Sequence, residues 1–228
     1  FQYGNLEGSY EIDTLRLLTV AFGMYGSNSK NYGDGFTTMY GADHEDIAYS
    51  YRTGNHGDGS WYSINGNIDY QRTSRKNKQR MITFSYKINT QPQTSNSNTG
   101  YEDIHAKEEV DDLVKRLLLK NSQSDGKTNT MEQTFQVDYT TPIGELHTVE
   151  AGAKYIFRRN TSDNKLYEAA GGSDDYLYNE DRSSDYRHLN HILAAYLGYT
   201  LKYKDFTFKP GVRYEPVSYT HLRAHETC

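Results

Sequence analysis

Several features that define common protein classes are scarce in this sequence. The 228 residues include one Cys, Cys228, and four Pro, which excludes disulfide scaffolds, Cys-based zinc sites and collagen. No stretch approaches the ~20 consecutive apolar residues of a membrane-spanning helix. Positive charge is not in excess, with 25 Lys and Arg against 30 Asp and Glu and a net charge of −5, which argues against a nucleic-acid partner.

Aromatic residues are abundant by contrast. The chain has 22 Tyr, 8 Phe and one Trp, together 14% of its residues, and disordered chains are poor in such residues. A folded, polar, aromatic-rich chain is therefore expected, in spite of a mean hydropathy of −0.89.

Apolar and polar residues alternate along several segments. Between 61 and 71 the even positions are Tyr, Ile, Gly, Ile and Tyr, whereas the odd positions are nearly all polar. The same period of two recurs around 14–25, 82–89, 134–139, 149–157, 193–201 and 206–214. Since side chains alternate between the two sides of a strand, each segment predicts a strand with one apolar and one polar side. With a short segment at 2–6, about eight strands are expected.

The connections between these strands alternate in length. Short ones are expected at 7–13, 73–78, 141–145 and 204–205, and long ones at 27–60, 90–130 and 160–185. In an antiparallel sheet all short turns then lie at one end, as in bacterial outer-membrane barrels with short periplasmic turns and long extracellular loops. The predicted fold class is all-β, an antiparallel up-and-down transmembrane β-barrel segment facing outer-membrane lipid. A soluble barrel or solenoid remains the alternative interpretation of the alternation.

A series of short segments then points to a family. In order they are Ile68-Asp-Tyr70, Thr83-Phe-Ser-Tyr86, Phe135-Gln-Val-Asp-Tyr-Thr-Thr-Pro142, Glu150-Ala-Gly-Ala-Lys-Tyr155, Arg158-Arg-Asn-Thr-Ser-Asp163, Ala194-Ala-Tyr196 and Pro210-Gly-Val-Arg-Tyr-Glu215. The series resembles the outer membrane β-barrel family of TonB-dependent receptor-like proteins of the type found in Bacteroidetes.

The resemblance implies a portion of a ~22-stranded barrel with a plug in its lumen, in a protein that takes up or senses a ligand with energy relayed by TonB. This chain begins with Phe1 and shows neither plug nor TonB box, so we expect a fragment: a partial barrel domain at 1–217 and a tail of doubtful origin at 218–228, which reads as neither strand nor loop. The plug domain, TonB and a surface lipoprotein are the partners expected.

Two sets of residues are candidates for function. Six ionisable residues on the polar side of the strands are expected to line the lumen: Asp69, Asp138, Glu150, Lys154, Arg213 and Glu215. Four loop tyrosines are expected to stack on a ligand: Tyr32, Tyr40, Tyr176 and Tyr178. We expect capture of the ligand by the long loops, then movement of the plug to open a path along the polar wall.

Other motifs support neither a metal site nor catalysis. His188 and His191 are three apart on a strand, so they point to opposite faces and cannot share a metal ion. The apolar spacing at 108–121 predicts a short amphipathic helix that packs on the barrel rim or contacts a ligand or lipoprotein. The basic turn at 72–80 is expected to be a solvated charged turn. No nucleophile elbow, P-loop or HExxH is present, so no enzyme, cofactor or metal is predicted.

Ligand uptake or sensing is thus the predicted function. Two alternatives stay open: a complete eight-stranded barrel with a structural or adhesion role, whose packed interior conducts nothing, and a soluble β binding module.

Overall fold

A computed structural model describes residues 1–41, 46–108, 111, 114, 119–170 and 173–224. The described chain is a single antiparallel sheet. Its strands are β1 (Gln2–Asp13), β2 (Arg16–Tyr40), β3 (Ile47–Thr73), β4 (Met81–Ala106), β5 (Lys120–Ile143), β6 (His147–Ala170), β7 (Leu177–Tyr203), β8 (Phe206–Phe208), β9 (Gly211–Tyr214) and β10 (Val217–Ala224). This confirms the predicted fold class. No helix within the described part has the length and apolar character to cross a membrane.

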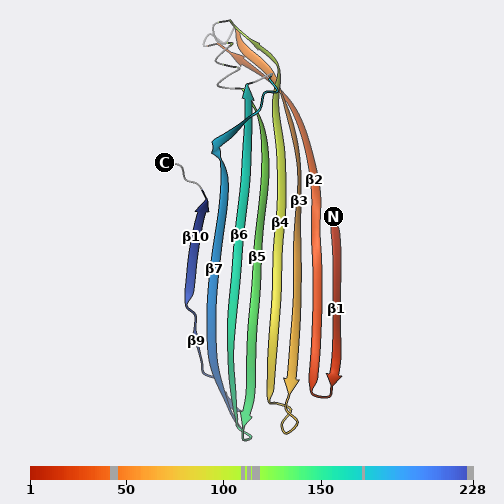
Figure 1. Cartoon of the computed structure of the whole chain (residues 1–228), viewed down its shortest axis with the longest axis vertical. Coiled ribbons are helices and arrows are strands. Elements are labelled where there is room, and N and C mark those ends of the chain that lie inside the picture. Colours follow the sequence, from red (N-terminus) through yellow and green to blue (C-terminus); the bar gives the residue numbers. More distant parts are fainter. Residues whose placement is uncertain (42–45, 109–110, 112–113, 115–118, 171–172, 225–228) are drawn as a thin grey trace.

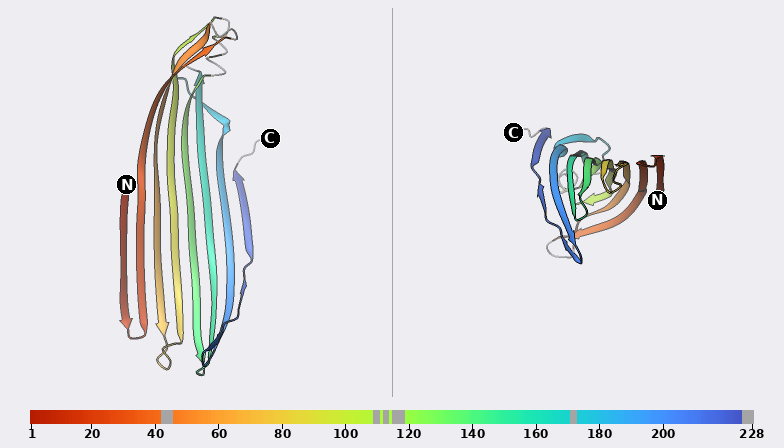
Figure 2. Two further views of the ribbon diagram at one scale, coloured as in Figure 1. Left: turned by 180° about the vertical axis from the view of Figure 1, so that it is seen from behind. Right: turned by 90° about the horizontal axis from the view of Figure 1, so that it is seen from below.

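Each strand pairs with the strand before and after it in sequence, in the order β1-β2-β3-β4-β5-β6-β7-β10 (Figure 1). The short connections at 14–15, 74–80, 144–146 and 204–205 all lie at one end of the sheet. Seen along the strands, the sheet is curved (Figure 2). β1 and β10 lie at its two opposite edges (Figures 1 and 2).

The last three strands act as one interrupted strand along β7. β8, β9 and β10 pair with successive stretches of β7, and the two breaks coincide with Pro210 and Pro216. Proline has no N–H for the ladder, but both carbonyls still accept a β7 amide: Tyr199 N–H donates to Pro210 at 3.0 Å and Leu193 N–H to Pro216 at 3.3 Å. Eight strand positions across the sheet therefore agree with the expected number.

The strands are far longer than the alternation predicted. β2 to β7 contain 24 to 27 residues each, which at about 3.3 Å per residue is roughly 80 Å, whereas a tilted membrane strand needs ~9–11 residues. The three expected long loops are therefore largely strand: they continue the ladder as hairpin extensions beyond the membrane-length portion. The first turn is also misplaced in the prediction, because β1 continues through 7–13 and turns at 14–15.

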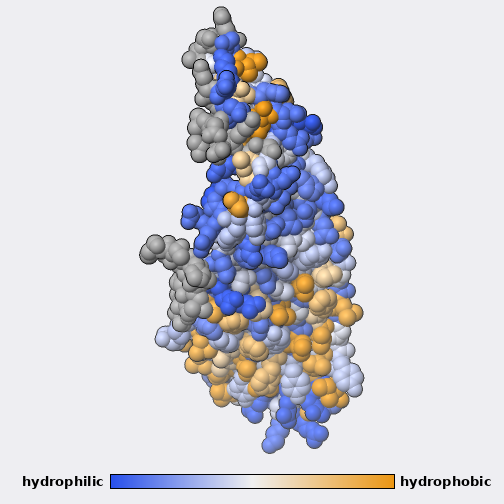
Figure 3. All heavy atoms as spheres, turned by 45° about the horizontal axis from the view of Figure 1, so that its top comes forward, coloured by the Kyte–Doolittle hydropathy of each residue, from blue (hydrophilic) through white to orange (hydrophobic). Residues whose placement is uncertain are grey.

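The two faces of the sheet differ as predicted. The apolar face carries side chains that are large yet exposed, such as Ile68 (46% exposed), Phe135 (49%) and Leu193 (55%). The polar face carries side chains that are polar yet buried, such as Ser63 and Thr134. Half-exposed apolar residues in a continuous band require an apolar solvent. In Figure 3 hydrophobic residues gather across the lower part of the visible surface, and hydrophilic residues cover the region above.

Above this band the apolar face changes character. At the positions that continue it, Ser60 Oγ and Thr94 Oγ1 lie 2.7 Å apart, and Tyr62 donates to Asn28 Oδ1 at 3.1 Å. At these positions the side that faces lipid further down carries hydrogen-bonded polar groups, as expected of strands surrounded by water.

The tail at 218–228 and the helix expected at 108–121 both fall partly outside the described residues. The segment 217–224 forms β10, so the expectation that it forms no strand is wrong, because its backbone pairs with 185–192 of β7; the origin of 218–228 stays a prediction. The helix expected at 108–121 lies mostly outside the described residues. Within it, Val114 and Leu119 are buried, and Leu119 N–H donates to the Val114 carbonyl at 2.8 Å.

Candidate functional site on the polar face

Five of the six predicted wall residues lie on one face of the sheet. Alternation along each strand and the register between strands place Asp69, Asp138, Glu150, Lys154 and Arg213 on the polar face, and Glu215, just beyond β9, lies beside Arg213. Figure 1 shows that these strands run side by side from β3 to β9.

Direct contacts join β5 and β7 around Asp138, across β6. Tyr196 of β7 donates its hydroxyl to Asp138 Oδ1 at 2.5 Å, and Gln136 donates to Asp138 Oδ2 at 2.7 Å. The tyrosine ring reaches β5 because Gly152 of β6 lies between the two register partners and has no side chain in the way. The carboxylate is thereby satisfied without a cation.

Other wall charges form ion pairs. Lys209 Nζ lies 3.2 Å from Glu150 Oε2, and Arg213 Nη2 lies 2.5 Å from Glu215 Oε2. Asn67 donates to the carboxylate of Asp69. The polar face is therefore a network of paired charges along the membrane-length part of the strands.

A hollow of about 500 Å³ opens on this face at membrane depth. Lys87 and Lys154 line it together with Glu132, Asn67 and Gln136. Glu132 also binds its register partner Arg158, at 2.5 Å from Nη2 and 2.9 Å from Nε. With two lysines and a paired carboxylate, the hollow is polar and carries net positive charge, which suits hydrogen-bonding or anionic groups.

A second polar centre lies further out, on the hairpin extension of β6. Glu168 is 11% exposed and accepts hydrogen bonds from Asn179 at 2.6 Å and from Arg182 at 2.5 Å, with Lys120 at 3.8 Å. The hydrogen bond from Asn179 and the charges of Lys120 and Arg182 lower the pKa of Glu168 from its ordinary value of 4.5, against the opposing effect of burial. Glu168 is therefore held as a carboxylate.

A bulge in β7 brings these partners together. The β6–β7 register passes from Asn164 opposite Ser184 to Leu166 opposite Asn179, so residues 180–183 bulge out of the ladder. Ser183 closes the bulge by donating to the Asn179 carbonyl at 2.6 Å and accepting from Leu166 N–H at 3.0 Å. Two hollows of about 370 and 450 Å³ adjoin Glu168, the smaller one lined also by Tyr101 and Leu166 and the larger one by Tyr178 and Asp181.

The four predicted ligand tyrosines are not brought together by the described contacts. Tyr32 is 73% exposed and its ring lies 4.5 Å from that of His56, and Tyr40 lies exposed at the end of β2. Tyr178 packs at 5.5 Å on Tyr167 beside the Glu168 hollows, and burial raises the pKa of nearby Tyr176. Whether any of the four binds a ligand stays a prediction.

Sequence reasoning missed the Glu168 centre. Glu168, Asn179 and Arg182 fall in a segment expected to be a loop, and their contact depends on the β7 bulge. Tyr101 and Lys120 come from the two arms of the neighbouring β4–β5 hairpin. These stretches are polar on both sides and do not alternate, so the sequence does not indicate which residues of β6 and β7 lie opposite each other.

The two strand histidines lie on opposite faces, as predicted. His191 Nδ1 lies 2.7 Å from the Tyr155 hydroxyl on the apolar face, and His188 follows the parity of the polar face. Among the described residues no cluster of three or more His, Cys, Asp or Glu is placed to hold a metal ion.

Residues 72–227 match the Outer membrane protein beta-barrel family. The chain belongs to this family. The protein is therefore an outer-membrane β-barrel protein, with the apolar face toward lipid, and the soluble binding module is excluded.

A solved structure similar to this barrel protein is the ferric citrate transporter FecA in its unliganded form. The identity is 13% and the TM-score 0.32, over 96% of this chain and 38% of the transporter. The chain thus spans little more than a third of that structure's length. No curated protein matches the sequence.

Proposed function

We propose that this barrel is part of a TonB-dependent receptor-like protein that takes up or senses a polar solute and catalyses no reaction. One observation carries the proposal. On the polar face of β4 and β5, the register pairs from Lys87 and Thr134 at the charged hollow to Thr99 and Ser122 near the Glu168 centre are all polar apart from Gly126, so a solute bound outside meets hydrogen-bonding groups along these two strands.

The outer centre has the properties of a capture site. It combines a nearly buried carboxylate, two cations and a tyrosine, Tyr101, beside open hollows, and sites of this kind orient polar ligands by a few placed groups. It lies on rigid paired strands rather than on free loops, so little conformational entropy is lost on binding. Capture by the hairpin extensions replaces capture by long loops.

The inner face suits passage rather than tight binding. Its carboxylates are paired with Arg158, Lys209 and Tyr196, so they present polar surface without a strong unpaired charge that would retain a solute. A plug domain and TonB, as implied by the family resemblance, would gate this path; the fragment status of the chain and its Bacteroidetes type belong to the same proposal.

The small eight-stranded barrel is the competing function. In such a barrel β1 would lie beside the β8–β10 strand, but the structure places them at opposite edges of the sheet (Figure 2). An unpaired strand edge is costly in lipid. We infer that further strands pair with both edges, which favours the larger transporter barrel.

The test compares uptake by cells. A strain without the gene is complemented with the full-length gene, either unchanged or carrying Glu168→Gln, and depletion of polar solutes from the medium is followed with and without a protonophore. We expect one solute class to be depleted by the unchanged protein, more slowly by Glu168→Gln, and not after loss of inner-membrane energy.

Asp163→Asn provides the matched control. Asp163 is a half-buried acid of the same strand that lies 3.9 Å from Lys165 and lines neither Glu168 hollow, and its loss should leave depletion unchanged. Identical depletion profiles with and without the gene would instead support the structural barrel.

A further inference from the structure

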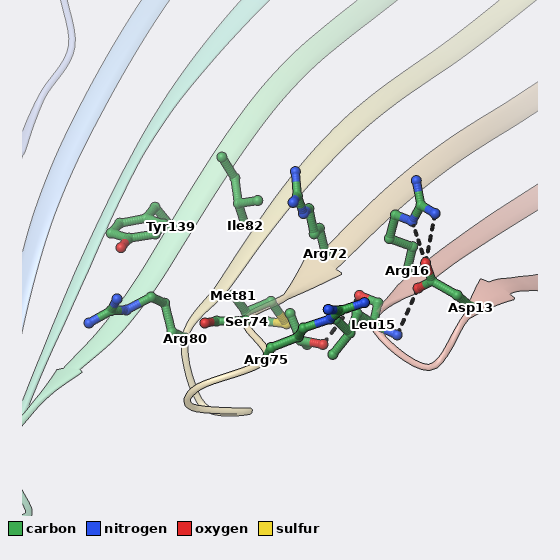
Figure 4. Close-up of a pocket in the computed structure, with 11 residues that line it drawn as sticks. Asp13, Leu15, Arg16, Arg72, Ser74, Arg75, Arg80, Met81, Ile82 and Tyr139 are labelled. Carbon is green, nitrogen blue, oxygen red and sulfur yellow. Dashed lines mark hydrogen bonds and ion pairs between the residues drawn. The ribbon is translucent and has the colours of Figure 1, made fainter.

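The turn end of the apolar face carries an unexpected set of cations. Arg16 of β2 and Arg72 of β3 are register partners, and the same row continues through Ile82 and Tyr139. All four side chains therefore lie on the lipid-facing side. Figure 4 shows Arg16 and Arg72 projecting side by side, on the same side of the strands as Ile82 and Tyr139.

These residues surround a hollow of about 600 Å³. Arg75 and Arg80 of the 74–80 turn also line it, so the lining holds four arginines and one carboxylate, that of Asp13, a net charge of +3. Asp13 is bound to Arg16, at 2.6 Å from Nη2 and 2.8 Å from Nε. Arg80 is oriented by its Nε, which donates to Thr141 Oγ1 at 3.0 Å.

The site combines this charge with apolar surface. Leu15, Met81 and Ile82 line the same hollow, with Tyr139 at 39% exposure. Guanidinium groups bind phosphate oxygens in a two-pronged geometry, and a water-soluble anion would gain nothing from the apolar half of the lining. A molecule with a phosphate and a hydrocarbon portion satisfies both halves.

The position of the hollow along the strands also suits a molecule with a phosphate and a hydrocarbon portion. An arginine facing lipid costs about 2–4 kcal/mol at the midplane and about 0–1 kcal/mol near the interface. Arg16 and Arg72 lie at the very start of β2 and the end of β3, one residue from the turns. The row therefore marks the level of the headgroups in the leaflet next to the short turns.

We propose that this hollow binds the phosphate of an anionic phospholipid from the periplasmic leaflet, with Arg72 and Arg75 as its principal ligands. Arg16, held by Asp13, and Arg80, held by Thr141, complete the positive rim. The basic turn is then a lipid clamp in addition to a solvated surface. This inference depends on the membrane placement of the barrel and not on the solute it takes up.

The test measures retained lipid on the full-length protein. Protein refolded in detergent is mixed with phosphatidylglycerol or phosphatidylcholine, and bound lipid is counted by native mass spectrometry. We expect a preference for phosphatidylglycerol that falls about fivefold for each arginine removed in Arg72→Gln and Arg75→Gln. Arg75 lies in an exposed turn, so its variant keeps the test valid if Arg72→Gln does not fold.

The control removes equal charge from the same turn. Lys76→Gln and Lys78→Gln lie outside the hollow lining and should leave the preference unchanged. If the lysine variants lost the phosphatidylglycerol preference equally, the lipid would be attracted to any positive charge of the turn, and the proposed site would be refuted. Displacement of the lipid by soluble glycerol phosphate would show an anion site without a lipid requirement, and equal retention of both lipids would also refute the proposal.

Discussion

Ile68 and Asn67 are neighbours in β3 whose side chains meet different surroundings. Ile68 lies on the apolar face at 46% exposure, and Asn67 lies on the polar face and donates to Asp69. We expect Ile68→Arg to lower the free energy of unfolding by about 2–4 kcal/mol, because a cation near the midplane must be taken into lipid.

Asn67→Arg is the matched variant and should cost much less, since it adds a cation beside a carboxylate. Urea unfolding of the full-length protein in lipid vesicles measures both. Similar losses for the two variants would contradict the assignment of faces.

The hydrogen bond from Tyr196 to Asp138 passes over Gly152, and only a residue without a side chain leaves room for it. An added Cβ would overlap the Tyr196 ring and lie 2.6 Å from Asp138 Oδ1. We expect Gly152→Ala to destabilise the barrel by about 1–3 kcal/mol, as overpacking does. Gly198→Ala is the control on the adjacent strand, where the nearest atom to a new Cβ is 3.7 Å away. The two variants are compared by the same unfolding measurement, and equal stability would show that Tyr196 moves aside freely.

Glu168 makes the β6–β7 extension sensitive to acid. Because its folded pKa lies below its ordinary value of 4.5, its contribution to stability is complete above that value and is lost as the pH falls through the lowered pKa. We expect the protection of backbone amides in 166–170 and 173–179 against hydrogen exchange, relative to the intrinsic rate at each pH, to fall below about pH 4.5. In Glu168→Gln the protection should already be weaker at neutral pH and lack that additional loss in acid; an unchanged acid response would place the sensitivity elsewhere.

At the scale of elements, the sequence predicted those strand portions that have a lipid side. Residues 61–71 and 193–201 alternate because one side meets lipid, and the two-residue turn at 204–205 is where it was expected. The alternation disappears beyond the band, at 27–40 for example, since water surrounds both faces there. The strand continues nevertheless, because its pairing depends on backbone hydrogen bonds that no side-chain period records.

The candidate site residues were likewise predictable only in the strand portions that have a lipid side. Asp69 and Lys154 were assigned to the polar face by their alternation with apolar neighbours. The Glu168 centre depends on a four-residue bulge and on the register of β5, β6 and β7. Register between distant strands is not encoded locally where neither face is apolar, so this centre was beyond prediction.

The two ends of the strands should differ in access to protease. Trypsin added to intact cells is expected to cut at the far ends of the hairpin extensions, at Lys107 or Lys120, and to spare the 74–80 turn although that turn has four basic residues. The reason is topological, because the short turns lie on the periplasmic side. Mass spectrometry of the released peptides identifies the sites. Permeabilised cells are the control, in which the turn becomes accessible, and cleavage of the turn in intact cells would invert the topology.

At the scale of the molecule, the sheet is open, with one unclosed edge at β1 and the other at the β8–β10 strand. β1 has β2 as its neighbour among the described strands, and the β8–β10 strand has β7. Every backbone group in lipid needs a partner, so both edges must be paired in the membrane. The two barrel sizes differ in whether these edges pair with one another.

Disulfide cross-linking decides between them. In full-length protein with Cys228→Ser, cysteines are placed at Gly4, Gly8 or Tyr10 of β1 together with Val212 or Tyr214 of β9. We expect no cross-link in cells, because a large barrel separates these strands by others. The control pair is Ala195→Cys with Tyr214→Cys, which are register partners and lie within the distance that a disulfide spans. Cross-linking of any β1–β9 pair would show a closed eight-stranded barrel, and its packed interior would then rule out a transport path along the polar face.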